Sequence, residues 1–282
     1  NSVQPFMELL GQEFDLIVFD RYVVRDVLPP SYLRNIVNFV KEGGALLLAV
    51  GPEFASLRSL YQTPLGKVMP AAPTGKVLER GFWPRLTDIG YRHPVTAGLP
   101  RNGTETPKWG RWFRQIEAVP KTGRVLMQGL DGKPLLLLDR IGKGRVAQIL
   151  SDHIWLWARG FEGGGPQAEL LRRLAHWLMK EPDLEEEGLK AEIRDGRLIV
   201  IRRSLEEETP EITVTTPSGM TRTLPLEKDG GATRAVLDVK ETGLYKVTDG
   251  TQTALATKGA LNPLELQDLR ASADRVLGVV KA

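Results

Sequence analysis

The chain has 282 residues, with 38 Lys and Arg against 35 Asp and Glu, so its formal net charge is only +3. Because these charges are mixed along the chain rather than gathered into blocks, the composition argues against a nucleic-acid partner. The absence of cysteine excludes disulfides, thiolate metal sites and a cysteine nucleophile. No apolar run approaches the ~20 residues that span a bilayer, and no signal-like segment follows Asn1. Because the chain begins with Asn1 rather than Met and its first strand signal comes at once, we expect an excised or processed piece of a longer protein.

The first elements read as strand, helix and strand. Phe14 to Asp20 is an apolar run typical of a buried strand, and Ser31 is a candidate N-cap for the helix that follows. The apolar positions of that helix recur at helical spacing until Gly43, which predicts its end. Ala45 to Val50 is a second apolar run. This order and spacing predict a right-handed parallel β-α-β unit.

A long stretch rich in proline, from residue 55 to residue 116, holds half of the six tryptophans and shows little periodicity. Such segments are often functional loops. Strand character returns at 125–128 and 135–138, with a hairpin-turn signal between them and a second glycine turn at 142–144. Val146 to Leu150 is then a buried strand that ends in polar residues, and apolar residues from Leu170 to Leu178 predict a closing helix.

The texture changes after Pro182. Residues 185–187 form an acidic linker, and about seven short alternating segments follow between 191 and 257, separated by glycine-containing turns. This pattern predicts a small β-sandwich of the immunoglobulin type, without its disulfide. Residues 260–282 carry helix signals and end without a stop signal, so we expect a truncated helical tail.

Three motifs in order resemble the class I glutamine amidotransferase-like superfamily, including the ThuA-like group and the amidotransferase domains of bacterial membrane proteins. The motifs are 39–48, 93–99 and 142–146 leading to Asp152 and His153. The resemblance implies a flavodoxin-like, doubly wound, mostly parallel α/β sheet over residues 1–184. The stretch 185–259 resembles the immunoglobulin-like modules of bacterial membrane-anchored proteins with von Willebrand-type domains.

One departure from that family bears directly on function. Active members place a cysteine at the sharp turn after a central strand and pair it with a histidine. Here the corresponding turn is Gly51-Pro52-Glu53, so Glu53 stands at the nucleophile position, while His153 matches the family's histidine. Without cysteine, glutamine hydrolysis through a thioester is excluded.

The resemblance therefore implies a non-catalytic binding or scaffolding module of a membrane-anchored bacterial envelope protein. We expect no cofactor and no resident metal. The expected partner is a protein of a membrane-associated assembly or a small-molecule ligand. A periplasmic face is preferred on the family likeness alone, with the cytoplasmic face left open.

Polar residues at the predicted strand ends are the candidate catalytic groups: Glu53, Asp152 and His153. Each has a simpler structural interpretation. Glu53 could be a first-turn carboxylate favoured by the helix dipole, and His153 could be a hydrogen-bonded structural residue. Asp20 and Arg21 end the first strand at the same predicted edge, where they could bind a ligand or form an ion pair.

Two aromatic–arginine clusters are the other ligand-binding candidates, and their key residues are Trp109, Arg111, Trp112 and Trp157. Arginine in such a cluster could hold a carboxylate or phosphate, whereas the structural alternative is a packed aromatic minicore. The triple glycine at 163–165 lacks the order of a phosphate-binding loop and is interpreted as a flexible loop.

Two alternatives to the scaffold remain open. One is a hydrolase that uses Glu53, Asp152 and His153, with or without a metal held by Asp20, Glu53 and His153. In the other, the β-sandwich is the working part and the α/β domain supports it. The hydrolase requires its residues to converge on one open pocket.

Overall fold

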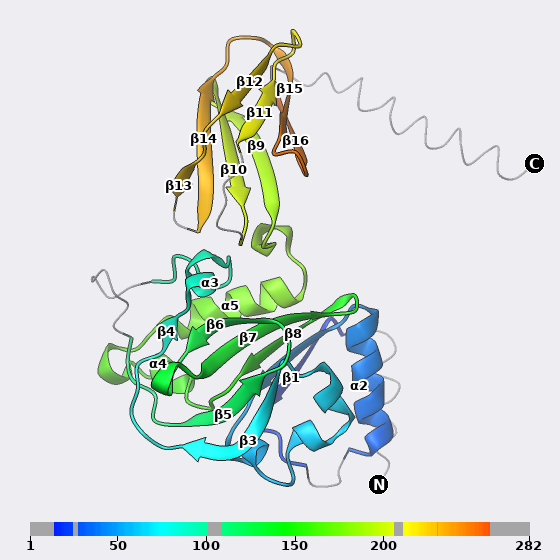
Figure 1. Ribbon diagram of the computed structural model, residues 1–282, viewed down its shortest axis with the longest axis vertical. Coiled ribbons are helices and arrows are strands. Elements are labelled where there is room, and N and C mark those ends of the chain that lie inside the picture. The colour runs from blue at the N-terminus through cyan, green and yellow to red at the C-terminus, as the bar shows by residue number, and fades with distance from the viewer. Residues whose placement is uncertain (1–13, 25–27, 101–108, 206–210, 230, 260–282) are drawn as a thin grey trace, which may run out of the picture. The chain divides into compact units, whose positions relative to one another are not determined.

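The computed structural model describes residues 14–24, 28–100, 109–205, 211–229 and 231–259. The chain divides into two compact units, residues 1–186 and 187–282. The first unit has two hydrophobic cores and the second has one, and each unit is described by itself (Figure 1). The predicted tail at 260–282 lies outside the described residues.

A six-stranded sheet forms the centre of the first unit. Its first three strands pair in parallel, and the remaining neighbours pair antiparallel. The order across the sheet is β1 (Leu16–Asp20), β2 (Ala45–Ala49), β8 (Gly144–Ile149), β7 (Pro134–Ile141), β6 (Arg124–Gln128) and β4 (Arg85–Leu86).

The expectation of a flavodoxin-like, doubly wound and mostly parallel α/β fold is therefore wrong. Strands account for 39% of the structure and helices for 24%, and the central sheet is mixed. The physical reason lies in the connections. Parallel neighbours need long crossovers, whereas short turns at 131–132 and 142–143 join β6 to β7 and β7 to β8 as hairpins. Gly142 adopts φ +61°, which suits it to the second turn.

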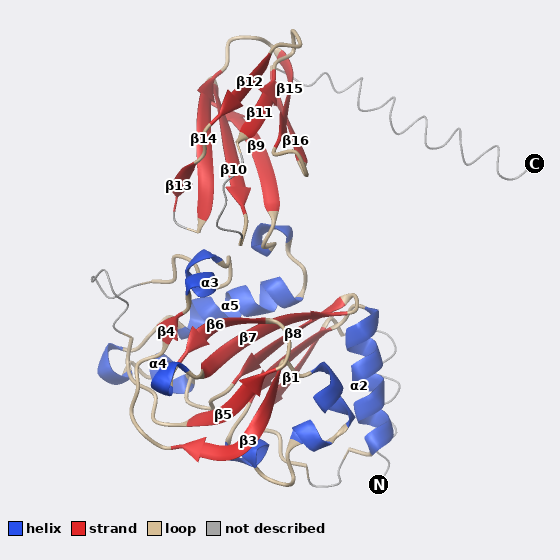
Figure 2. Ribbon diagram, in the orientation of Figure 1, coloured by secondary structure: helices blue, strands red, loops and turns tan. Residues whose placement is uncertain are grey.

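Two helices cover opposite faces of this sheet (Figures 1 and 2). Helix α2 (Pro30–Glu42) buries Leu33, Ile36, Val37 and Val40 and ends at Gly43, whose φ of 134° few other residues tolerate. Helix α5 (Gln167–Leu178) buries its own apolar stripe on the other side. Successive residues of β2 point alternately into the two cores, as the pleat of a strand requires.

The proline-rich stretch contributes a two-stranded antiparallel sheet and several short helices. The sheet pairs β3 (Ala71–Leu78) with β5 (Gln115–Pro120). The short helices in or beside this stretch are η1 (Pro52–Ala55), η2 (Leu60–Gln62), η3 (Pro64–Val68) and α3 (Asp88–Arg92). Further along the chain lie the short helices η4 (Leu130–Gly132), α4 (Trp155–Ala158), η5 (Phe161–Gly163) and η6 (Pro182–Leu184).

The second unit has two four-stranded antiparallel sheets around one core. The first has the order β13 (Glu227–Asp229), β14 (Ala232–Asp238), β10 (Arg197–Arg203) and β9 (Gly188–Arg194). The second has the order β12 (Thr221–Leu224), β11 (Ile212–Thr215), β15 (Gly243–Thr248) and β16 (Thr253–Lys258). Alternating residues of β10 and β15 fill the core, as expected for strands with one face toward solvent. Its relation to immunoglobulin-like modules stays a prediction.

None of the helices in the described ranges is long and apolar enough to cross a membrane.

Candidate functional site

The carboxyl ends of β1, β2 and β8 meet at one edge of the central sheet, because these three strands are parallel. Arg21 follows β1, Glu53 follows β2 on helix η1, and Asp152 follows β8. The structure brings these three side chains into contact, and we call this place the strand-end rim. His153 and Arg114 complete it.

Arg21 links the two carboxylates of the rim. Its Nη2 donates to Oε1 of Glu53 over 2.9 Å, and its Nε lies 3.3 Å from Oδ2 of Asp152. The backbone of Arg21 has φ +48°, a left-handed conformation that costs a non-glycine residue on the order of 1 kcal/mol. Two ion pairs made by the same side chain offset that cost.

Gly51 lies against the pair formed by Arg21 and Glu53. A Cβ atom on Gly51 would lie 2.6 Å from Oε2 of Glu53 and 2.9 Å from Nε of Arg21, so both side chains would have to shift. Burial by itself raises the pKa of Glu53. The hydrogen bond from its own backbone amide and the Arg21 guanidinium outweigh this effect and bring the pKa below its usual value of 4.5.

Asp152 is the most enclosed member of the rim, with a side chain that is 4% exposed. Its Oδ2 accepts a hydrogen bond of 3.1 Å from Nη1 of Arg114, in addition to the contact with Arg21. Arg114 also lies 3.3 Å from Glu79. Two guanidinium groups therefore contact one buried carboxylate, as in a structural ion-pair network.

His153 has a defined hydrogen-bonding state. Its Nδ1 accepts from the backbone N–H of Phe113 over 3.1 Å, so in the neutral ring the proton belongs on Nε2. Burial lowers the pKa of His153 below its usual 6.5; Arg114 and Arg21 add to this, and Asp152 only partly opposes it. Its Nε2 lies 3.8 Å from Oδ1 of Asp152, too far for a hydrogen bond.

Two carboxylate oxygens of the rim, Oε2 of Glu53 and Oδ1 of Asp152, are buried and lack a hydrogen-bond partner within the described part of the chain. Asp20 is exposed at the end of β1 and makes no ion pair with a described residue. Across the described ranges, no three histidine, cysteine, aspartate or glutamate side chains are grouped so that they could hold a metal ion.

The four aromatic–arginine candidates differ in burial. Trp109, Trp112 and Trp157 are buried to within 3% exposure and pack against one another at ring distances of 5.2 and 4.8 Å, as in the aromatic minicore alternative. Arg111 instead lies near the surface. Its Nε is 3.0 and 2.9 Å from the two carboxylate oxygens of Glu162.

Sequence reasoning missed Arg114, Glu79 and Phe113. All three lie in or beside the proline-rich stretch, at positions without local periodicity. Their only sequence signal was that Arg114 stands directly before a strand, which does not identify its partners.

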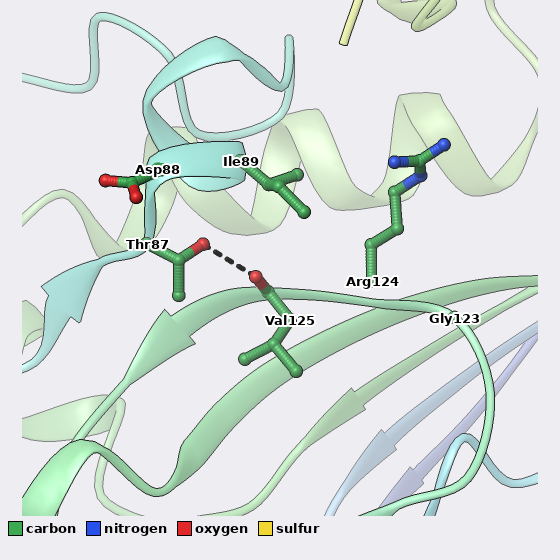
Figure 3. Close-up of a pocket in the computed structure, with 6 residues that line it drawn as sticks. All are labelled: Thr87, Asp88, Ile89, Gly123, Arg124 and Val125. Carbon is green, nitrogen blue, oxygen red and sulfur yellow. Dashed lines mark hydrogen bonds between the residues drawn. The ribbon is translucent and has the colours of Figure 1, made fainter. Parts of the chain in front are cut away.

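A separate open depression of about 710 Å³ lies between the start of α3 and the start of β6 (Figure 3). Thr87 closes one side, with its hydroxyl donating to the carbonyl of Val125 over 2.6 Å. None of the predicted site residues lines it. The remaining lining residues are Asp88, Ile89, Gly123 and Arg124.

Comparison with known proteins gives distant structural similarity. No family model and no curated protein matches the chain. The cytoplasmic protein STM3548 of Salmonella typhimurium is 21% identical over 61% of this chain and 74% of its own, with a TM-score of 0.48. The cytoplasmic protein STM1381 of the same species is 21% identical over 61% of this chain and 72% of its own, with a TM-score of 0.42. A ThuA-like protein of Parabacteroides merdae is also among the structural neighbours. It is 16% identical over 60% of this chain and 75% of its own, with a TM-score of 0.37.

Other neighbours carry the titles of glycoside hydrolases, including an exo-β-1,4-mannosidase and several β-galactosidases. The mainly β-sheet content and the mixed central sheet of the structure correct the description of the first unit as flavodoxin-like.

Proposed function

We propose that the chain is a non-catalytic binding or scaffolding module of a membrane-anchored bacterial envelope protein. The observation that carries this proposal is the pair of contacts that Arg21 and Arg114 make with the buried carboxylate of Asp152. A carboxylate in that position stabilises the fold and is not available to a substrate.

The other candidate catalytic groups support the same conclusion. A general base needs an accessible lone pair and a pKa near the working pH. Glu53 is paired with Arg21 and has a lowered pKa. The Nδ1 lone pair of His153 is used by the amide of Phe113, and its Nε2 carries the proton. With no cysteine in the chain, the rim is better suited to holding a structure than to forming a covalent intermediate.

The cellular setting in this proposal rests on sequence resemblance. The motifs at 93–99 and 142–146 favour a finer relation to the ThuA-like group, and residues 185–259 resemble modules of membrane-anchored bacterial proteins. We place the soluble part in the periplasm, with the cytoplasmic side as the alternative. The partner is a protein of a membrane-associated assembly or a small-molecule ligand.

A hydrolase is the second candidate, and one observation favours it. Oε2 of Glu53 and Oδ1 of Asp152 are buried without a partner, and His153 Nε2 lies 3.8 Å from the latter oxygen. Buried polar atoms without partners are uncommon and occur at reactive sites. In this alternative Glu53, Asp152 and His153 would together act on a substrate.

Hydrolysis assays separate the two candidates. The wild-type chain, Glu53→Gln, His153→Ala and the control His176→Ala are tested on p-nitrophenyl esters, phosphates and glycosides. The proposal predicts that no protein gives turnover above buffer. Turnover that persists in His176→Ala but is lost in both Glu53→Gln and His153→Ala would establish the hydrolase and overturn the proposal.

A further inference from the structure

The exposed aromatic side chains of the first unit include Trp83, Trp155 and Phe161, whereas Trp109, Trp112 and Trp157 are buried. Trp83 is 50% exposed, Trp155 is 52% exposed and Phe161 is 39% exposed. Isolated exposed aromatics need no explanation, whereas a connected group of them marks an interaction site. The contacts among these residues therefore show whether they form a connected group.

Arg111 and Phe113 connect Trp83 to Phe161, and Trp155 is linked to Phe113 only through His153. The guanidinium of Arg111 lies 5.4 Å from the ring centre of Trp83 and 5.4 Å from that of Phe113. Phe113 meets Phe161 edge to face at 5.6 Å. The amide of Phe113 also holds His153, whose ring lies 6.4 Å from that of Trp155. We call Trp83, Arg111, Phe113, Trp155 and Phe161 the aromatic surface.

Hydrogen bonds fix this surface in place. Glu162 accepts from the side chain and from the backbone amide of Arg111. The amide of Gly110 donates to the carbonyl of Gly164 over 2.7 Å, and a Cβ atom on Gly110 would lie 2.1 Å from the carbonyl oxygen of Phe161. These hydrogen bonds join the segment 110–111 to the segment 162–164. A preformed surface loses little conformational entropy on binding.

The charges of the surface are paired, and its indoles are free to donate. Arg111 is paired with Glu162, and the neighbouring Arg114 is paired with Glu79 and Asp152. This balance does not favour a strongly charged ligand. The indole N–H groups of Trp83 and Trp155 make no hydrogen bond within the described ranges, so both can donate to a partner.

We propose that the aromatic surface binds a proline-rich segment of a partner protein in the polyproline II conformation. Such a segment has no internal hydrogen bonds, so its carbonyls accept from donors such as indole N–H groups. Its flat, uncharged proline rings pack on aromatic faces. Tryptophan and arginine are also the residues most enriched where protein partners bind tightly. This proposal rests on the proposed binding function and names the class of its partner.

Fluorescence anisotropy with a fluorescein-labelled decaproline peptide tests the proposal on the full chain. We expect saturable binding that Trp83→Ala and Trp155→Ala each weaken about tenfold or more. Trp83→Phe keeps a ring but not the N–H donor and should fall between Trp83→Ala and wild type. Leu57→Ala, at a side chain 96% exposed outside the surface, should bind like wild type. A labelled Gly-Ser decapeptide should not bind.

Three results would overturn this inference. They are an absence of saturable decaproline binding, equal binding by wild type and Trp83→Ala, and Trp83-dependent binding of cellohexaose without binding of decaproline. Circular dichroism of each variant shows whether it is folded. The inference and the proposed function fail separately, because only turnover in the hydrolysis assays contradicts a non-catalytic role.

Discussion

At the scale of single residues, Asp152 has the most demanding position in the first unit. Its carboxylate is nearly enclosed, and two arginines from different parts of the chain contact the same oxygen. Losing the contacts of a buried charged carboxylate is costlier than losing an exposed ion pair. The rim residues therefore have testable consequences for stability.

Replacing Asp152 with asparagine should lower the free energy of unfolding by about 1.5 to 3 kcal/mol, because contacts to a buried charged carboxylate are lost while Arg21 keeps Glu53 and Arg114 keeps Glu79. Urea denaturation measures the change. Asp131→Asn is the matched control, since the pair between Asp131 and Arg80 is exposed on both sides and should contribute less than about 1 kcal/mol. Equal losses in the two variants would contradict a structural role for Asp152.

At the scale of elements, the acidic residues Glu185 and Glu186 form ion pairs with other residues of the first unit. Glu185 pairs with Arg140 and Arg145, and Glu186 lies 3.0 Å from His93 Nε2 and 3.4 Å from Arg140. The sequence reasoning interpreted this stretch as a solvated linker. In the structure these residues belong to the first unit and pair with β7, β8 and the turn after α3.

The pH dependence of stability should report on Glu186. Burial raises its pKa, but the hydrogen bond from His93 and the charges of His93, Arg140 and Arg124 outweigh this and lower the pKa to about 2 from 4.5. Because the folded pKa is the lower one, Glu186 stabilises the chain above about pH 4.5, and this contribution is lost as the pH falls toward 2.

Glu186→Gln should therefore flatten the loss of stability between these two pH values, as measured by urea denaturation at each pH. Glu42→Gln, at an exposed position on α2, provides the comparison and should keep the wild-type slope. An unchanged slope in Glu186→Gln would show that the pair with His93 does not contribute.

Local patterns predicted the elements better than the resemblance predicted their assembly. The strands expected at 14–20, 45–50 and 146–150 are found as β1, β2 and β8, and Gly43 ends α2. The turn signals at 131–132 and 142–144 already indicated hairpins, which are incompatible with a mostly parallel sheet. Those short-range signals agree with the mixed sheet, while the family likeness led to the wrong fold class.

The candidate site was predicted in part for a similar reason. Residues after parallel strands share one edge, so Arg21, Glu53 and Asp152 could be grouped from the order of elements alone. Arg114 and Phe113 could not, because their approach to the rim depends on the path of the proline-rich stretch. Trp109 and Trp157 have the composition of a pocket, and only packing shows that they lie in the core.

At the scale of the whole molecule, the two hydrophobic cores of the first unit are separate from the single core of the second. Trp177 is fully buried in the first unit, and Tyr245 is 1% exposed in the second. Replacing either with alanine should destabilise its own unit by about 3 to 5 kcal/mol through the cavity it leaves. We expect Trp177→Ala and Tyr245→Ala to lower different transitions in a calorimetric scan. A single transition that both variants lower equally would contradict separate folding of the units.

In the proposed role the strand-end rim holds the fold together and does not act on a substrate, and the position of the proton on His153 tests this most directly. The chain has only three histidines, so ¹⁵N NMR of the rings with a His153→Ala reference assigns the signal. We predict that His153 is neutral at pH 7, with its proton on Nε2 and a pKa below 6.5. A proton on Nδ1 with a pKa of 6.5 or above would leave Nε2 free as a general base beside Asp152, and would contradict the account.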